Sequence, residues 1–198
     1  GETASLINPA LDRILDFAGE SGLAVILHND IDMPFAKADA EPVYLQQTKA
    51  LLRRHPKTAI IWAHTGLGRV VHPAEVSAQS AERSPRHVEI LAAMLDDPAL
   101  SHVLFDISWD EVAKYAVSSP DSVARVADLL NRYPDRFLFG TDVVAPASLA
   151  SPMAVYDAYA PLWQALTPEA SQKVRFGNYA RLFDAARVHH RDPVAHGE

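Results

Sequence analysis

The stretch that decides the fold is TAIIWAH at residues 58–64, five apolar residues in a row between a threonine and a histidine. Three similar runs occur along the chain: LAVILH at 23–28, HVLFDIS at 102–108 and RFLFGTD at 136–142. Strands that are apolar on both faces are typical of parallel sheets covered by helices, whereas half-exposed antiparallel strands alternate with polar residues. The four runs therefore predict parallel strands in an α/β fold.

Proline marks where the helices between these runs begin. In five places a proline follows an Asn, Ser or Thr, whose side chain can cap the free N–H groups of a first helical turn. The pairs are Asn8-Pro9, Ser84-Pro85, Ser119-Pro120, Ser151-Pro152 and Thr167-Pro168. Apolar residues at three- and four-residue spacing follow, as between residues 11 and 18. The sequence thus predicts four βα units with right-handed crossovers, plus a leading and a trailing helix.

The composition narrows the classes of function. A formal charge of −7, without a cluster of basic and aromatic residues, argues against a nucleic-acid partner. We expect no membrane or export segment, because no apolar run approaches about 18 residues and GETASLIN at 1–8 lacks signal-peptide character. The absence of cysteine leaves histidine and carboxylates as the strong ligands or bases. The compartment stays open, with the cytoplasm preferred.

Polar residues gather at the carboxyl end of each predicted strand, at 28–30, 64–66, 106–109 and 140–142. In parallel α/β folds this edge is where loops converge and ligands bind. Strand alternation puts His28 on the face of Ile26, and His64 on the face of Trp62, so we expect both imidazoles to point the same way.

Three of these residues, His28, His64 and Asp142, together form a ligand set for Zn²⁺ or a similar divalent ion. Each has a plainer interpretation on its own. Either histidine could be a hydrogen-bonded loop residue, and Asp142 could be a turn or helix-cap residue. The occurrence of all three at strand ends of one predicted sheet favours the functional interpretation.

Five segments resemble, in their order and spacing, the second half of the metal-dependent amidohydrolase superfamily. The segments are LAVILH, IIWAHTGLGR, HVLFDISW, FLFGTD and FGNYARLF. The most similar branch is the amidohydrolase-related group that also contains aromatic-acid decarboxylases. The resemblance covers residues 8–183 and implies a TIM-type (β/α)8 barrel. It implies that His28 is a metal ligand, that His64 binds a second metal or acts on substrate or water, and that Asp142 binds metal and takes the proton of the attacking water.

The chain also departs from this family. The His-x-His pair of the family's first strand is missing, and a complete barrel typically needs about 250 residues. We therefore expect one domain over 1–198 that supplies strands five to eight of the barrel, with a flexible tail over 188–198. Four open strands would leave unpaired edges and an apolar face, so the chain should form a homo-oligomer or associate with a missing N-terminal barrel half.

Three further residues are candidates for the site. Arg69 could bind an anionic group of a substrate or form a surface salt bridge. Trp109 could line a substrate pocket or pack against the next helix. Asp106 lies within an apolar run, where an unpaired charge is costly, so it either pairs with a cation or a polar network near the site or faces a helix N-terminus.

The resemblance implies a metal-dependent hydrolase that cleaves a C–N or C–O bond in a small amide, lactone or ester. Zinc is the expected metal, with manganese, iron or cobalt as alternatives. A divalent ion lowers the pKa of bound water, and an adjacent carboxylate can accept its proton. One alternative is a non-oxidative decarboxylase of a small aromatic or unsaturated acid. The other is a catalytically silent half-barrel fragment or assembly domain.

Overall fold

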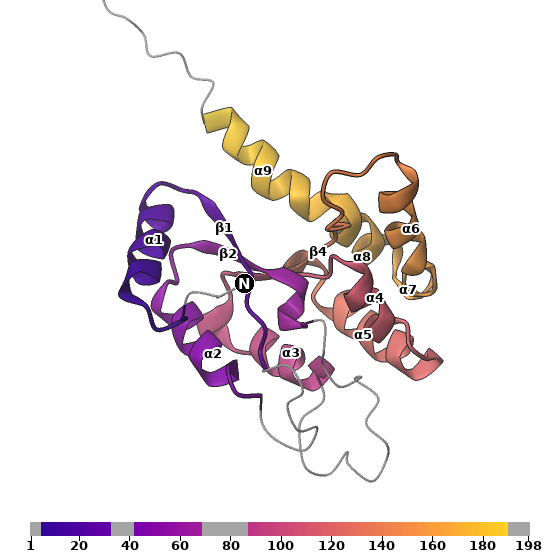
Figure 1. Cartoon of the computed structure of the whole chain (residues 1–198), viewed down its shortest axis with the longest axis horizontal. Helices are drawn as coiled ribbons and strands as arrows, with labels where there is room; N and C mark the ends of the chain where they lie inside the picture. The colour runs from indigo at the N-terminus through magenta and orange to yellow at the C-terminus, as the bar shows by residue number, and fades with distance from the viewer. Residues whose placement is uncertain (1–4, 33–41, 69–86, 190–198) are drawn as a thin grey trace, which may run out of the picture.

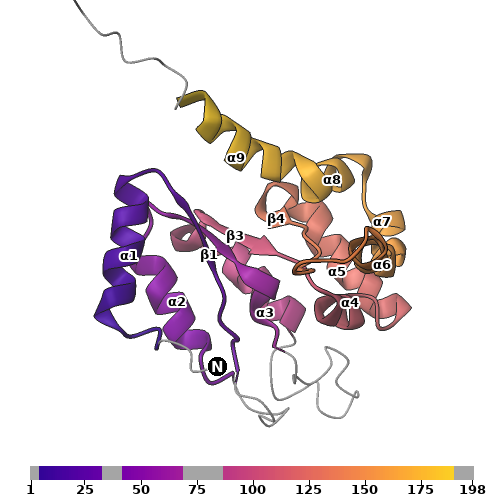
Figure 2. The same ribbon diagram turned by 45° about the horizontal axis from the view of Figure 1, so that its top comes forward.

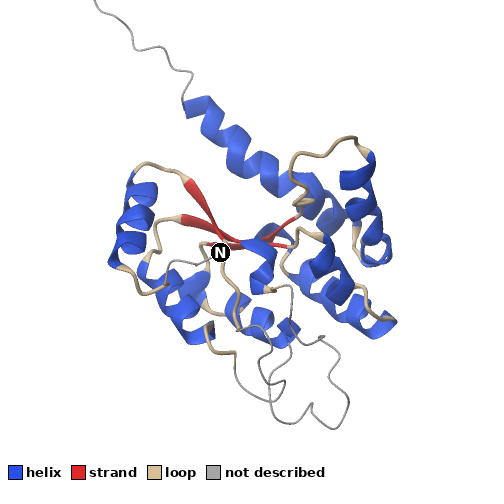
Figure 3. Ribbon diagram, viewed as in Figure 1, coloured by secondary structure: helices blue, strands red, loops and turns tan. Residues whose placement is uncertain are grey.

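The computed structural model describes residues 5–32, 42–68 and 87–189, and for 185–189 the backbone alone. Within these ranges four strands form one parallel sheet in the order β1-β2-β3-β4. The strands are β1 (Ala24–Leu27), β2 (Ala59–Trp62), β3 (Val103–Asp106) and β4 (Phe137–Leu138). Neighbours in sequence are neighbours in the sheet, with helices between them (Figures 1 and 3). The predicted α/β class and the four parallel strands are confirmed.

The helices alternate with these strands along the chain. The α-helices are α1 (Pro9–Glu20), α2 (Leu45–Arg54), α3 (His87–Leu95), α4 (Asp110–Ala116), α5 (Pro120–Arg132), α6 (Ala150–Ala158), α7 (Ala160–Ala165), α8 (Pro168–Gln172) and α9 (Asn178–His189). Shorter turns are η1 (Ala63–Gly66), η2 (Pro98–Leu100), η3 (Pro134–Arg136) and the π-turn η4 (Lys173–Gly177). The expected tail from 188 starts inside the last turn of α9, and residues 190–198 lie outside the described part of the chain.

Three of the five predicted helix starts are confirmed with their caps. The side chains of Asn8, Ser119 and Thr167 accept hydrogen bonds from backbone N–H groups of the first turns of α1, α5 and α8. The fourth prediction is wrong by two residues, because α6 begins at Ala150 and Pro152 lies within its first turn, where a missing N–H is tolerated. The fifth pair, Ser84-Pro85, lies outside the described residues.

The strand register shows which side chains share a face of the sheet. Leu27, Trp62, Phe105 and Phe137 are in register, and their face forms the main core against the helices. Ile61, Leu104 and Leu138 belong to the opposite face and form a smaller cluster, on which Leu182 and Phe183 of α9 pack. Helix α9 accordingly lies across the sheet from α2 and α3 (Figures 1 and 2).

The β1 side of the sheet has no strand beside it within the described ranges. Four large apolar residues of α1, of β1 and of the turn between them are largely exposed: Ile14, Phe17, Leu23 and Ile26. An edge strand presents a row of backbone N–H and C=O groups with which another strand could pair. Among the described residues, no helix has the length and apolar character needed to cross a membrane.

Candidate active site at the strand ends

The backbone beyond β2 turns sharply into a left-handed conformation. His64 has φ 55° and Thr65 φ 52°, and Gly66 continues the turn with φ 73°. Trp109, after β3, and Asp142, after β4, also have positive φ, at 88° and 56°. Such a conformation costs a residue other than glycine on the order of 1–3 kcal/mol and persists where the surrounding structure enforces it. The strained residues thus gather at the carboxyl ends of the strands, the edge that the sequence predicts for the site.

Glycine at position 66 is required by two features of this turn. Its φ is positive, and a Cβ there would lie 2.2 Å from the Trp62 ring and 2.7 Å from Ile31. The absence of a side chain lets the loop after β1 approach, and the Ile31 N–H donates to the Gly66 carbonyl at 2.9 Å. The Trp62 indole N–H also donates to the Asn29 carbonyl at 3.1 Å. These bonds hold the loop that carries His28 against the loop that carries His64.

The imidazoles of His28 and His64 meet edge to face, with ring centroids 4.9 Å apart. Their proximity was expected, but the strand-parity argument for it is wrong. Ile26 is in register with Ile61, so Trp62 points to the opposite face of the sheet from Ile26. The rings meet because β2 ends at Trp62 and the left-handed turn redirects the His64 side chain.

His64 is the buried centre of the group, with a 7% exposed side chain. Its Nδ1 lies 3.0 Å from Ser108 Oγ and 3.3 Å from the Ser108 carbonyl oxygen. Its Nε2 lies 3.8 Å from Asp142 Oδ2. The Trp109 ring lies 5.0 Å from the imidazole, centroid to centroid, and also packs against the main core. That Trp109 lines a substrate pocket stays a prediction.

Asp106 joins the same polar network and does not stand alone in the apolar strand. It accepts hydrogen bonds from the Ser108 hydroxyl, from the Ser108 N–H at 3.0 Å and from the His64 N–H at 3.4 Å. Burial raises the pKa of the Asp106 carboxyl, and the hydrogen bonds from Ser108 and His64 act against this shift. Of the two interpretations from sequence, the polar network near the site is therefore confirmed.

Ser108 is the residue of this network that the predicted site lacked. The signal was present, since it follows Asp106 by two residues and strand alternation puts both on one face. The Tyr159 hydroxyl donates to the carbonyls of Ile107 and Trp109, the residues on either side of Ser108, and so stabilises the main chain there.

His28 and Asp142 form the solvent-facing side of the site. The His28 side chain is 63% exposed and its Nε2 lies 3.7 Å from Asp30 Oδ1. The Asp142 side chain is 44% exposed. Both groups are therefore open to a substrate or an ion from outside. Arg69, the predicted anion-binding residue, lies outside the described residues.

The donor set of the site suits a divalent ion in its chemistry. Two imidazoles and a carboxylate are common ligands of Zn²⁺, which binds them at about 2.0–2.2 Å. Tetrahedral ligands at that distance are roughly 3.3 Å apart, close to the 3.8 Å between His64 Nε2 and Asp142 Oδ2. Nevertheless, no group of three His, Cys, Asp or Glu side chains in the described ranges is arranged to hold a metal. The structure thus brings one imidazole nitrogen and one carboxylate oxygen close together, while His28 Nε2 lies 3.7 Å from Asp30 Oδ1.

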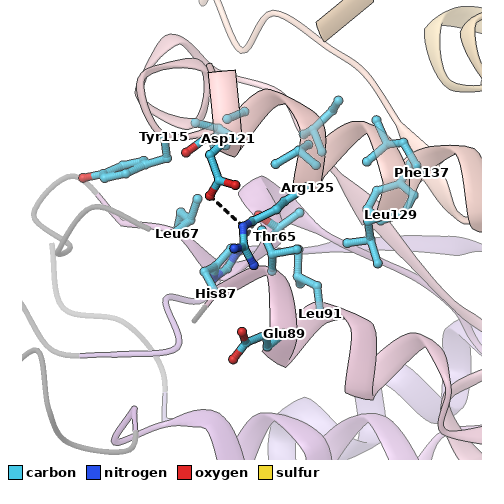
Figure 4. A pocket seen from close by; sticks show the side chains of 17 residues that line it. Thr65, Leu67, His87, Glu89, Leu91, Tyr115, Asp121, Arg125, Leu129 and Phe137 are labelled. Atoms are coloured by element: carbon cyan, nitrogen blue, oxygen red, sulfur yellow. Dashed lines mark hydrogen bonds and ion pairs between the residues drawn. The ribbon is translucent and has the colours of Figure 1, made fainter. Parts of the chain in front are cut away.

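A cavity of about 60 Å³ lies behind η1, between the sheet and helices α3, α4 and α5 (Figure 4). Its walls are largely apolar, and none of His28, His64 and Asp142 lines it. His87 lines it, with Nε2 3.1 Å from Thr65 Oγ1 and a buried Nδ1 that has no hydrogen-bond partner. Burial lowers the pKa of His87 to about 4. The cavity is therefore separate from the strand-end site.

The sequence profile described as "Amidohydrolase" matches residues 2–185. The chain belongs to the amidohydrolase family. This confirms the family that the strand-end motifs indicated, and the four parallel strands agree with part of a TIM barrel. No curated protein matches this amidohydrolase chain.

Solved structures show the same fold at low sequence identity. A zinc-bound amidohydrolase from Burkholderia multivorans has 17% identity and a TM-score of 0.58, over 90% of this chain and 58% of that one. An uncharacterised TIM-barrel protein from Bordetella bronchiseptica has 19% identity and a TM-score of 0.56, over 93% and 53%. A putative 2-pyrone-4,6-dicarboxylic acid hydrolase from Pseudomonas putida has 18% identity and a TM-score of 0.52, over 92% and 59%. The amidohydrolase chain thus spans little more than half the length of these proteins.

Proposed function

We propose that this amidohydrolase chain carries half of the active site of a metal-dependent hydrolase, which is completed in an intact barrel. The observation that carries the proposal is the meeting of His64 Nε2, the Asp142 carboxylate and the His28 ring at three strand ends. These three side chains would hold the divalent ion, with zinc as the first candidate and manganese, iron and cobalt as alternatives. A bound ion of this kind supplies a water of lowered pKa and polarises a substrate carbonyl.

The residues of the chain have separate tasks in this reaction. The Asp142 carboxylate, open to solvent, accepts the proton of the attacking water at Oδ2. The single lone pair of the buried His64 Nε2 serves either as a metal ligand or as the group that receives and returns a proton, and the Trp109 ring lies 5.0 Å from the imidazole. The proposed substrates are small amides, lactones or esters. The solved hydrolase from P. putida and the zinc-bound amidohydrolase from B. multivorans support this class.

The decarboxylase alternative gains no support from the described contacts. It relied on Arg69 to hold a substrate carboxylate, and Arg69 lies outside the described residues. The silent-domain alternative remains as an outcome of the tests below.

The partner that we propose is an N-terminal barrel half. Strand β1, at the edge of the sheet, and the helix α1 before it carry the exposed Ile14, Phe17 and Ile26, and the next strand and helix of a barrel would pack at this edge. The chain also covers only 53–59% of the length of the solved structures compared above. A second copy of the chain is the competing occupant of this face.

The test of the function is turnover by the intact barrel with the N-terminal half restored. Against a panel of small lactones, amides and esters, Asp142→Asn should lower kcat at least about 100-fold, because it removes a proton acceptor. Asp128→Asn is the matched control, since Asp128 lies on the exposed side of α5. Equal turnover by both variants would contradict the assigned role, and an inactive barrel would favour the silent-domain alternative.

A further inference from the structure

The side chain of Ser108 lies between two other groups of the candidate site. Its Oγ is 3.0 Å from His64 Nδ1 and is also hydrogen-bonded to Asp106 Oδ2. All three residues are largely shielded from solvent, since Ser108 is 6% exposed and the side chains of His64 and Asp106 are 7% and 14% exposed. A hydrogen-bonded series therefore runs from a carboxylate through a hydroxyl to an imidazole.

The acceptors around His64 Nδ1 decide which ring nitrogen carries the hydrogen. The Ser108 carbonyl oxygen, 3.3 Å from Nδ1, can only accept a hydrogen bond. The Ser108 hydroxyl has one proton and donates it to Asp106 Oδ2, so its oxygen is left to accept from the ring. Both contacts require Nδ1–H. The Nε2 of a neutral ring then carries the lone pair.

This lone pair points toward the other groups of the site. Nε2 lies 3.8 Å from Asp142 Oδ2, and the His28 ring stands edge-on to the His64 ring. Ligation of a metal and acceptance of a proton both need an unprotonated Nε2. The opposite tautomer would present an N–H to Asp142 and could do neither.

We propose that Ser108, held by Asp106, is a positioning residue that fixes His64 in the Nδ1–H tautomer and directs the Nε2 lone pair at Asp142. The role of this tautomer in turnover rests on the proposed function, but the tautomer itself does not. Removal of the hydroxyl leaves the Ser108 carbonyl at 3.3 Å as the remaining neighbour on Nδ1, because Asp106 Oδ2 is 3.9 Å away. The ring then loses the shorter of the two contacts that favour Nδ1–H and keeps only the weaker one.

The test is ¹⁵N NMR of the imidazole rings in the 198-residue chain, with the His64 signals assigned by their loss in His64→Asn. At a pH where the ring is neutral, the wild type and Ser108→Thr should show Nδ1–H, because threonine keeps the hydroxyl. Ser108→Ala should show a larger Nε2–H population than the wild type, because only the longer contact with the Ser108 carbonyl remains on Nδ1. If Ser108→Ala does not fold, Asp106→Asn tests the same hydrogen-bonded series and should shift the His64 tautomer in the same direction. The proposal would be overturned if wild-type His64 carried its hydrogen on Nε2. It would also be overturned if the His64 tautomer stayed unchanged in the variant that folds.

A second measurement separates this inference from the proposed function. In the intact barrel, Ser108→Ala should lower kcat about 10–100-fold with little change in KM, as for other residues that orient a ligand or base, and Ser108→Thr should restore most of it. Unchanged kcat in Ser108→Ala would overturn the positioning role. A barrel inactive in every form, with the expected His64 tautomer, would overturn the hydrolase proposal and support the inference on Ser108.

Discussion

His64 Nε2 and Asp142 Oδ2 face each other at 3.8 Å, although they come from strands that are separated by β3 in the sheet. Two unusual backbone conformations make this approach possible, because both residues have positive φ. The pair lies at the carboxyl edge of the sheet, where parallel α/β folds bind their ligands.

The first prediction concerns the turn after β2. Gly66→Ala should lower the free energy of unfolding by about 3 kcal/mol, because it adds a clash with Trp62 and Ile31 to an unfavourable φ. Gly22→Ala is the matched control, since Gly22 has φ 68° but open space around it, and should cost only about 1 kcal/mol. Urea unfolding of both variants measures the difference. Equal losses would show that close packing does not constrain the turn.

The second prediction concerns His87, the partly buried histidine behind η1. The pKa of His87 falls to about 4 in the folded chain, from an ordinary value of 6.5. Between these values the unfolded chain binds more protons, so stability rises with pH and is lost as the pH falls from about 6.5 toward 4. The free energy of unfolding that is lost through protonation of His87 should reach at most about 3 kcal/mol. Urea unfolding at pH 7 and pH 5 should show a smaller difference in His87→Gln than in the wild type.

Val88→Ala is the control for that experiment, because it trims a neighbouring partly buried side chain without changing a titratable group. It should lower stability by the same amount at both pH values. If His87→Gln and Val88→Ala keep the same pH dependence, His87 is not the group responsible.

The third prediction concerns the open face beside β1. Phe17→Ser should weaken association of the chain with a separately expressed N-terminal barrel half at least tenfold, because an exposed apolar contact is lost. Tyr179→Ser, which removes an equally exposed aromatic ring from α9, should have little effect. Sedimentation velocity of the mixed halves measures the association. A chain that forms only homodimers sensitive to Phe17→Ser would show that a second copy occupies this face.

The parallel strands were predictable because their apolar runs are buried on both faces, as shown by Trp62 and Ile61 on opposite sides of β2. His64 was identified because it stands at the carboxyl end of a predicted parallel strand, and Asp106 because an unpaired charge within an apolar run is costly. The orientation of His64 was not predictable from alternation, since the left-handed turn that breaks the alternation depends on tertiary packing around Gly66. Ser108 was missed because serine is common at strand ends, and its importance appears only once His64 and Asp106 are placed beside it.

The most direct test of the account is the metal content of the intact barrel, purified without a tag and truncated before His189 to remove the terminal histidines. The account predicts about one divalent ion per barrel in the wild type and in Asp128→Asn, and loss of most of that ion in His28→Asn, His64→Asn or Asp142→Asn. Metal retained at the wild-type level in all three site variants would contradict a metal centre at these strand ends.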